Sequence, residues 1–191
     1  MATLHIELNG KEILYAGGDD YCSLSWDVNC SRYEESFAQL WVSGMIERTE
    51  AIYDHAYWLE DFSLAAGDRL EFRCGSGHGT SIVNRLQTHE QLEDLRKECA
   101  RAEAAGEYDA ARSAQRVPLR GACGIGLKTP DGRTREVRAS ESVMTVLCNG
   151  IWSNHHKPNE WRLRLWSMPA KQTAPGFWQP IEGSAHVTIQ A

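Results

Sequence analysis

The chain has 191 residues, of which 42% are hydrophobic and 24% charged, and its formal net charge is −6. This balance is typical of a globular chain, because a disordered one has fewer apolar residues and more net charge. No run approaches the ~20 apolar residues that cross a bilayer, and the alternating N-terminus lacks the basic start and apolar block of a signal peptide. We therefore expect a cytoplasmic protein without a membrane segment.

Short strands separated by turns are expected in residues 1–86. Leu4, Ile6 and Leu8 alternate with polar neighbours and stop at the hairpin dipeptide Asn9-Gly10. Similar runs of period two follow at Leu24–Val28, Leu40–Val42 and Leu70–Cys74. Short strands with frequent turns predict a small antiparallel sandwich or barrel.

The apolar spacing changes to that of a helix near residue 88. Leu92, Leu95, Cys99 and Ala102 recur at steps of three and four, so they share one helical face. Thr88 is the expected N-cap, and a glutamine three residues later completes a capping box.

A second, shorter helix is expected after Gly106, over Tyr108–Ala114, because Pro118 then ends the helical run. The two helices together predict a helical hairpin over residues 87–117.

Residues 92–115 also resemble the UVR-type helical hairpin, a protein-docking element of excision-repair subunits and some stress adaptors. The residues that carry the match are Ala104, Ala105, Tyr108, Asp109, Ala110 and Ala111. The Leu-Arg-Asp that follows in the family is absent. The resemblance covers about one eighth of the chain and implies helix-mediated protein binding.

Strand signals return in residues 118–191 and echo those of the first region. The matching features, in chain order, are Ile6 and Ile125 before their turns, Leu40 and Leu163, Met45 and Met168, Trp58 and Trp178, and Gly67 and Gly183. Their shared order predicts a duplicated β-domain. The predicted fold is α+β and mainly β, with an N-terminal acidic β-domain (1–86), the hairpin (87–117) and a C-terminal basic β-domain (118–191).

Opposite charges support this division. The net charge is −8 over residues 1–88 and +4 over residues 117–191, with −2 between them. The two regions either attract each other or face different partners.

An acidic aromatic stretch, Asp54–Asp61, has the residue types of a metal site or of acid–base chemistry. No metal-binding motif such as HExxH is present, and the favoured interpretation is a loop or helix with Trp58 in the core and the carboxylates in water. Aromatic side chains beside acids also suit an interface. Tyr57, Trp58, Glu60 and Asp61 are therefore candidates for partner binding.

Two further segments carry histidines. His155 and His156 fall in an expected exposed hairpin turn, and could share a metal only there. The segment Cys74–Ser81 alternates glycine with other residues but lacks the lysine of a phosphate-binding loop. It is expected to be a connector, although His78 and Ser81 are hydrolase-type residues.

The chain is rich in tryptophan, with seven. Trp161, Arg162 and Arg164 interleave aromatic and basic groups, as a stacking platform for nucleic acid does. The acidic net charge argues against nucleic acid. Leu163 and Leu165 are expected to face the core while the arginines face solvent.

The six cysteines include no CxxC pair, so no structural zinc site is predicted. Buried thiols that act as small hydrophobic side chains are expected instead. No other cofactor is implied.

No catalytic or metal pattern is complete, and the aromatic content exceeds what two small cores need. We expect a non-catalytic protein-binding role with another protein as partner, as in a bacterial immunity or inhibitor protein. The candidate binding residues are Tyr57, Trp58, Glu60, Asp61, Trp161, Arg162 and Arg164.

Two alternatives stay open. One is a metal-dependent hydrolase or nuclease that uses His55, Asp61, His78, His155 or His156. The other is nucleic-acid binding through the basic C-terminal half.

Overall fold

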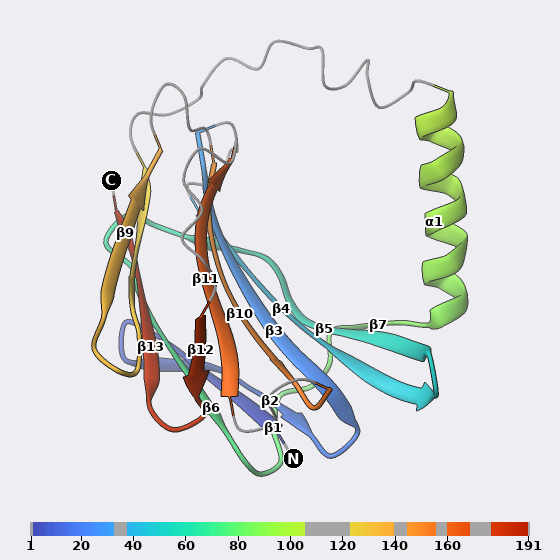
Figure 1. Cartoon of the computed structure of the whole chain (residues 1–191), viewed down its shortest axis with the longest axis horizontal. Coiled ribbons are helices and arrows are strands. Elements are labelled where there is room, and N and C mark those ends of the chain that lie inside the picture. Colours follow the sequence, from blue (N-terminus) through green and yellow to red (C-terminus); the bar gives the residue numbers. More distant parts are fainter. Residues whose placement is uncertain are drawn as a thin grey trace.

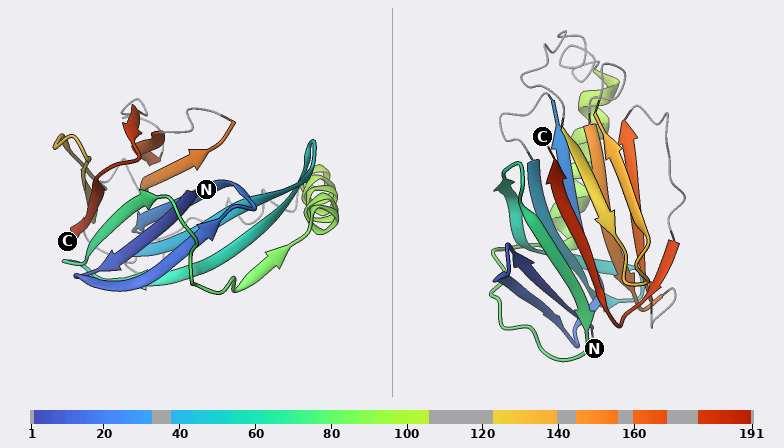
Figure 2. Two further views of the ribbon diagram at one scale, coloured as in Figure 1. Left: turned by 90° about the horizontal axis from the view of Figure 1, so that it is seen from below. Right: turned by 90° about the vertical axis from the view of Figure 1, so that its left-hand side faces the viewer.

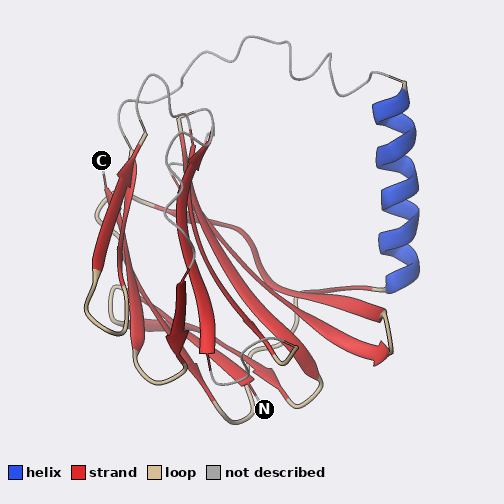
Figure 3. Cartoon of the chain, in the orientation of Figure 1, coloured by secondary structure: helices blue, strands red, loops and turns tan. Residues whose placement is uncertain are grey.

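In the computed structural model, two antiparallel sheets pack face to face, and the one helix of the described residues stands beside them (Figures 1 and 3). The structure describes residues 2–32, 38–105, 123–139, 145–155, 160–168 and 177–190. The protein is mainly β, as predicted. Within the described residues, no helix is long and apolar enough to span a membrane.

The first sheet has six strands in the order β2-β1-β6-β13-β8-β9. Their bounds are β1 Ala2–Leu8, β2 Lys11–Gly18, β6 Arg69–Gly75, β8 Gly124–Lys128, β9 Thr134–Arg138 and β13 Ser184–Gln190. The turn between β1 and β2 is the predicted one, with Asn9 and Gly10 both at positive φ. Such a turn favours asparagine and glycine.

The second sheet has seven strands in the order β12-β11-β10-β3-β4-β5-β7. Their bounds are β3 Tyr21–Ser31, β4 Ala38–Thr49, β5 Ile52–Leu64, β7 Arg85–Gln87, β10 Thr145–Ser153, β11 Glu160–Met168 and β12 Phe177–Pro180. The stretch Asp54–Asp61, expected as a loop or helix, is a strand instead. Asp54 and Ala56 occupy two of its three buried positions, beside Trp58, which weakens the apolar alternation that marks a strand.

The second half of the chain repeats the connectivity of the first. In each half a hairpin enters the six-stranded sheet, three strands enter the other sheet, and a last strand returns. The residues matched in the sequence lie on equivalent strands, except Gly67 and Gly183, which lie in the equivalent turns before β6 and β13. Ile6 pairs with Phe72 in the first half, and Ile125 pairs with Ile189 in the second. A duplicated unit would give this arrangement, and common ancestry of the halves stays a prediction.

Both sheets contain strands from both halves. β6 pairs with β13 in one sheet and β3 with β10 in the other, so the two halves lie side by side (Figure 2). The boundaries predicted near residues 86 and 117 remain a prediction about units of the chain. The strands on either side of them share two sheets and one cluster of buried apolar side chains.

Trp26 lies at the centre of that cluster. Its ring stacks on Phe72 of the opposite sheet with 3.8 Å between centroids, and it meets the edge of Trp161 at 6.2 Å. Gly150 on the neighbouring strand makes room for the indole, because a Cβ there would lie 2.4 Å from Trp26 Nε1. Residues from both halves and both sheets therefore meet at one tryptophan.

The helix α1 spans His89–Ala104 and has the predicted capping box between Thr88 and Gln91. None of its side chains is fully buried. The described residues contain this one helix, so the predicted helical hairpin is not supported. The expected second helix, Tyr108–Ala114, lies outside the described residues, as do Tyr108, Asp109, Ala110 and Ala111 of the UVR-like run.

Candidate functional site

The predicted binding residues lie on two strands of the seven-stranded sheet, β5 and β11. Three strands, β10, β3 and β4, separate them. Four steps of ~4.8 Å place the two groups roughly 19 Å apart. They do not form one compact site.

Two of the predicted residues belong to the core. Trp161 is fully buried and Trp58 nearly so. Trp58 contacts the ring of Tyr21 at 5.0 Å and donates from Nε1 to the backbone oxygen of Ser81 at 3.3 Å. Trp161 is thus not available for stacking on nucleic acid, whereas Leu163 and Leu165 face the core as predicted.

Two of the predicted residues on β5, Tyr57 and Glu60, form a cluster with Arg85 of β7. The Arg85 guanidinium lies 4.0 Å from the ring centroid of Tyr57. Its Nη2 also donates to Glu60 Oε1 at 2.6 Å, and this contact lowers the pKa of Glu60. Asp61 is exposed at φ 54°, where β5 carries an extra residue opposite β4.

The arginines of β11 lie on the outer side of the sheet, as expected. Arg162 is partly exposed and Arg164 exposed. The Arg164 guanidinium lies 5.8 Å from the ring centroid of Trp166 on the same strand.

The cross-strand register connects the two groups. Arg162, Ile151, Ser25, Ser43 and Tyr57 are successive neighbours across five strands, so Arg162 and Tyr57 point to the same side. We call this surface the seven-stranded face; the members that matter here are Asp27, Asn29, Trp41, Tyr57, Asn149, Arg162, Arg164 and Trp166.

A second row crosses the middle of the seven-stranded face. Arg164, Asn149, Asp27 and Trp41 are successive neighbours on β11, β10, β3 and β4. Asp27 is partly buried, and burial raises the pKa of its carboxyl, while a hydrogen bond from the Asn149 side chain opposes the shift. The period-two run Leu24–Val28 predicts only that Asp27 lies between buried neighbours and points outward. It gives no indication that Asp27 is itself partly buried.

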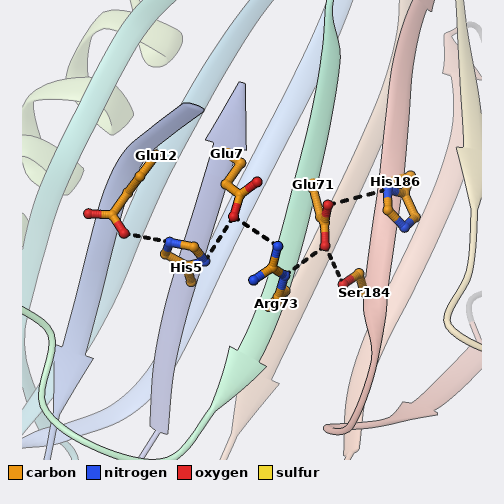
Figure 4. A network of polar contacts seen from close by, with 7 residues as sticks. All are labelled: His5, Glu7, Glu12, Glu71, Arg73, Ser184 and His186. Atoms are coloured by element: carbon orange, nitrogen blue, oxygen red, sulfur yellow. Dashed lines mark hydrogen bonds and ion pairs between the residues drawn. The ribbon is translucent and has the colours of Figure 1, made fainter. Parts of the chain in front are cut away.

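The six-stranded sheet carries a different outer face, which we call the six-stranded face (Figure 4). Its polar network comprises His5, Glu7, Glu12, Glu71, Arg73, Ser184 and His186. Arg73 is central, because its Nε donates to Glu71 Oε1 at 2.6 Å and its Nη2 to Glu7 Oε1 at 2.8 Å.

The ends of this network are also paired. His5 Nε2 lies 2.6 Å from Glu12 Oε2, and Ser184 Oγ donates to Glu71 Oε1 at 2.6 Å. Arg73 is the main cause of a lowered pKa at Glu71, and Ser184 adds to it. Charged ladders of this kind are common on a solvated sheet face and keep it from joining other sheets.

The other candidate catalytic groups are dispersed. Asp54 accepts from Arg48 Nε at 2.7 Å and from the backbone N–H of His89 at 3.0 Å. Both donors lower the pKa of Asp54, which holds the N-terminus of α1 in place. His55 is on the opposite side of the same strand, and burial lowers its pKa.

The glycine-rich segment is a connector, as predicted. It covers the free edge of β2, where Ser81 N–H donates to the Tyr15 oxygen at 2.8 Å and Ser81 Oγ accepts from Tyr15 N–H at 2.8 Å. A Cβ at Gly79 would lie 2.4 Å from the Ala16 backbone, so this approach requires glycine. His78 lies 3.8 Å from Asp19 and is not placed beside Ser81 as a base.

The segment that carries His155 and His156 begins as a turn, as predicted, in the part that the structure describes. Asn154 and His155 follow β10, and His155 Nε2 lies 3.8 Å from Glu47 Oε2. His156 lies outside the described residues. Across the described ranges, no group of three or more His, Cys, Asp or Glu residues is placed to hold a metal ion.

The cysteines act mainly as buried apolar side chains. Cys22, Cys30, Cys123 and Cys148 are buried, and no disulfide joins any of the six. Burial raises the pKa of the Cys74 and Cys148 thiols, which suppresses thiolate chemistry at both.

Comparison with known proteins gave no match to a protein-family model, a curated protein or a solved structure.

Proposed function

We propose that this chain is a non-catalytic protein-binding module, of the type represented by bacterial immunity and inhibitor proteins. It binds its partner through the seven-stranded face. The observation that carries the proposal is the shared orientation of Tyr57, Glu60, Arg162 and Arg164 on one sheet face.

The composition of this face supports protein binding. Trp41, Tyr57 and Trp166 are partly exposed, and arginine lies beside two of these three rings. Tryptophan, tyrosine and arginine are the residues most enriched among those that dominate binding energy at protein interfaces. Neither nucleic-acid binding nor hydrolysis has such support, because Trp161 is buried and the candidate histidines are dispersed.

The test is capture of a partner from the native lysate with matched charge reversals. Arg164→Glu changes the seven-stranded face, and Lys128→Glu changes an exposed residue on the outer side of the six-stranded sheet. We expect the native chain and Lys128→Glu to retain one stoichiometric protein that Arg164→Glu loses. No stoichiometric protein, or equal retention by both variants, would refute the proposal.

A further inference from the structure

Three hydrogen-bond acceptors meet near the centre of the seven-stranded face. Asp27 and Asn149 are direct cross-strand neighbours on β3 and β10. Asn29 lies two residues beyond Asp27 on the same strand and therefore on the same side. Asn149 is 8% exposed, while Asp27 and Asn29 are partly exposed.

The amide of Asn149 has a defined orientation. Its side chain hydrogen-bonds to the Asp27 carboxyl and lowers the pKa there, which requires that the NH₂ group donates to the carboxylate. The opposite atom, Oδ1, is buried and meets no hydrogen-bond donor within the described part of the chain. Asn29 Oδ1 is likewise buried without a donor there.

Unpartnered buried acceptors cost free energy, so this arrangement favours an incoming donor. The desolvation of an unpartnered amide oxygen is left uncompensated, and here two such oxygens flank a carboxyl group. A neutral donor would satisfy the amides, whereas a cation would also neutralise Asp27.

The chain does not use its own nearest cation for this purpose. Arg164 is the cross-strand neighbour of Asn149, but its guanidinium lies near Trp166. Among the described residues no ion pair joins it to Asp27, and the pKa of Asp27 is raised by burial.

We propose that Asp27, Asn29 and Asn149 form a recess that receives the guanidinium group of an arginine side chain from the partner protein. This inference rests on the proposed function and names the chemistry that the seven-stranded face recognises. A planar guanidinium carries five N–H donors and can bond a carboxylate and neighbouring amide oxygens together. Trp41, which lies opposite Asp27 on β4, provides a ring beside which the cation can lie.

The recess can be tested on the full chain without the partner. The probe is N-acetyl-arginine amide, followed by NMR of the Asn29 and Asn149 side-chain amides and the Trp41 indole. The neutral control is N-acetyl-citrulline amide, which has almost the same shape but carries no charge. We expect saturable shifts at millimolar concentration with the arginine compound and none with citrulline.

Matched variants locate the binding. Asp27→Asn removes the carboxylate and is expected to weaken arginine binding about tenfold or more, as the loss of a charge-assisted hydrogen bond implies. Glu7→Gln, which removes a carboxylate of the six-stranded face, should leave it unchanged. Asn29→Ala is a second variant of the recess that retains the charge, and we expect several-fold weaker binding.

The outcomes separate this inference from the function on which it rests. Absence of saturable shifts, equal shifts with citrulline, or equal binding of N-acetyl-lysine amide would each overturn the guanidinium recess. If that occurs while Arg164→Glu still abolishes partner capture, the binding function stands and the recess is wrong. Arginine binding without any captured partner would support the recess and contradict the proposed function.

Discussion

The outer faces of the two sheets differ in how their polar side chains are hydrogen-bonded. On the six-stranded face, Arg73 bonds both Glu7 and Glu71, and His5 bonds Glu12. On the seven-stranded face, Asp27 has an amide as its described partner, and the oxygen of that amide has no described donor.

This difference separates the paired charges around Arg73 from the unpartnered acceptors around Asp27, although Gln190 Oε1 in the six-stranded sheet is also buried without a described donor. Paired charges at a solvated face contribute little to stability and offer little to a ligand. Buried acceptors without donors are costly in a folded chain, so their presence beside the partly exposed Asp27 supports the proposed binding role. The contrast favours the seven-stranded face as the binding surface, and three experiments test or sharpen it.

The largest expected effect concerns the connection between the sheets rather than their surfaces. Gly150→Ala places a methyl group against Trp26, where the rigid indole cannot move aside, and should cost about 1–3 kcal/mol of unfolding free energy. Gly126→Ala in the six-stranded sheet meets only the flexible end of Gln190 at 3.2 Å. We expect it to be neutral or stabilising by about 0.5 kcal/mol.

Urea denaturation of both glycine variants checks this prediction. An equal loss in the two variants would contradict the expected clash between a side chain at position 150 and the Trp26 indole.

A smaller effect is expected from removing one arginine on each face. Arg73→Ala leaves Glu7 and Glu71 without their shared cation and should cost about 0.5–1 kcal/mol, since the pair is partly exposed. Arg164→Ala should change stability by less than ~0.5 kcal/mol, as is usual for an exposed residue. Thermal unfolding at low and high salt is the measurement, and only the Arg73 effect should shrink in salt.

If Arg164→Ala proves the more destabilising arginine variant, then Arg164 has a structural role, and its part in partner binding would need another explanation.

The smallest expected effect is a difference between Asp27 and Glu71 in the sign with which each makes stability depend on pH. The pKa of Asp27 is raised in the folded state, so its contribution is present at low pH and is lost as pH rises through the folded pKa. Asp27→Asn should therefore stabilise the chain at neutral pH and lose this advantage in acid.

Glu71 should behave in the opposite way, because its pKa is lowered. Its contribution is present above its unfolded pKa and is lost as pH falls through the folded pKa. Glu71→Gln should destabilise the chain at neutral pH and approach the native stability in acid. Chemical denaturation between pH 3 and about pH 7 measures both, and slopes of the same sign would contradict the difference between the faces.

Local features of this protein were readable from the sequence alone. The Asn9-Gly10 turn, the capping box of Thr88 and Gln91, and the alternation of Leu163 and Leu165 with arginines all appear as predicted. Each depends on backbone preferences or side-chain periodicity within a few residues.

Tertiary structure decided what those elements do together. The pairing of β3 with β10 joins residues more than 110 positions apart, and no local pattern names the partner of a strand. β5 was missed because two of its buried positions hold Asp54 and Ala56. Asp54 is buried where Arg48 and the start of α1 hydrogen-bond to it.

The candidate site shows the same division. The alternation along β11 correctly predicted that Arg162 and Arg164 point away from the core. It did not predict that they share a sheet face with Tyr57. The alternation around Trp26 marked Asp27 as outward-facing. Its partial burial, and the orphaned oxygens of Asn29 and Asn149 nearby, arise only when β3 and β10 lie side by side, because desolvation depends on neighbours in space.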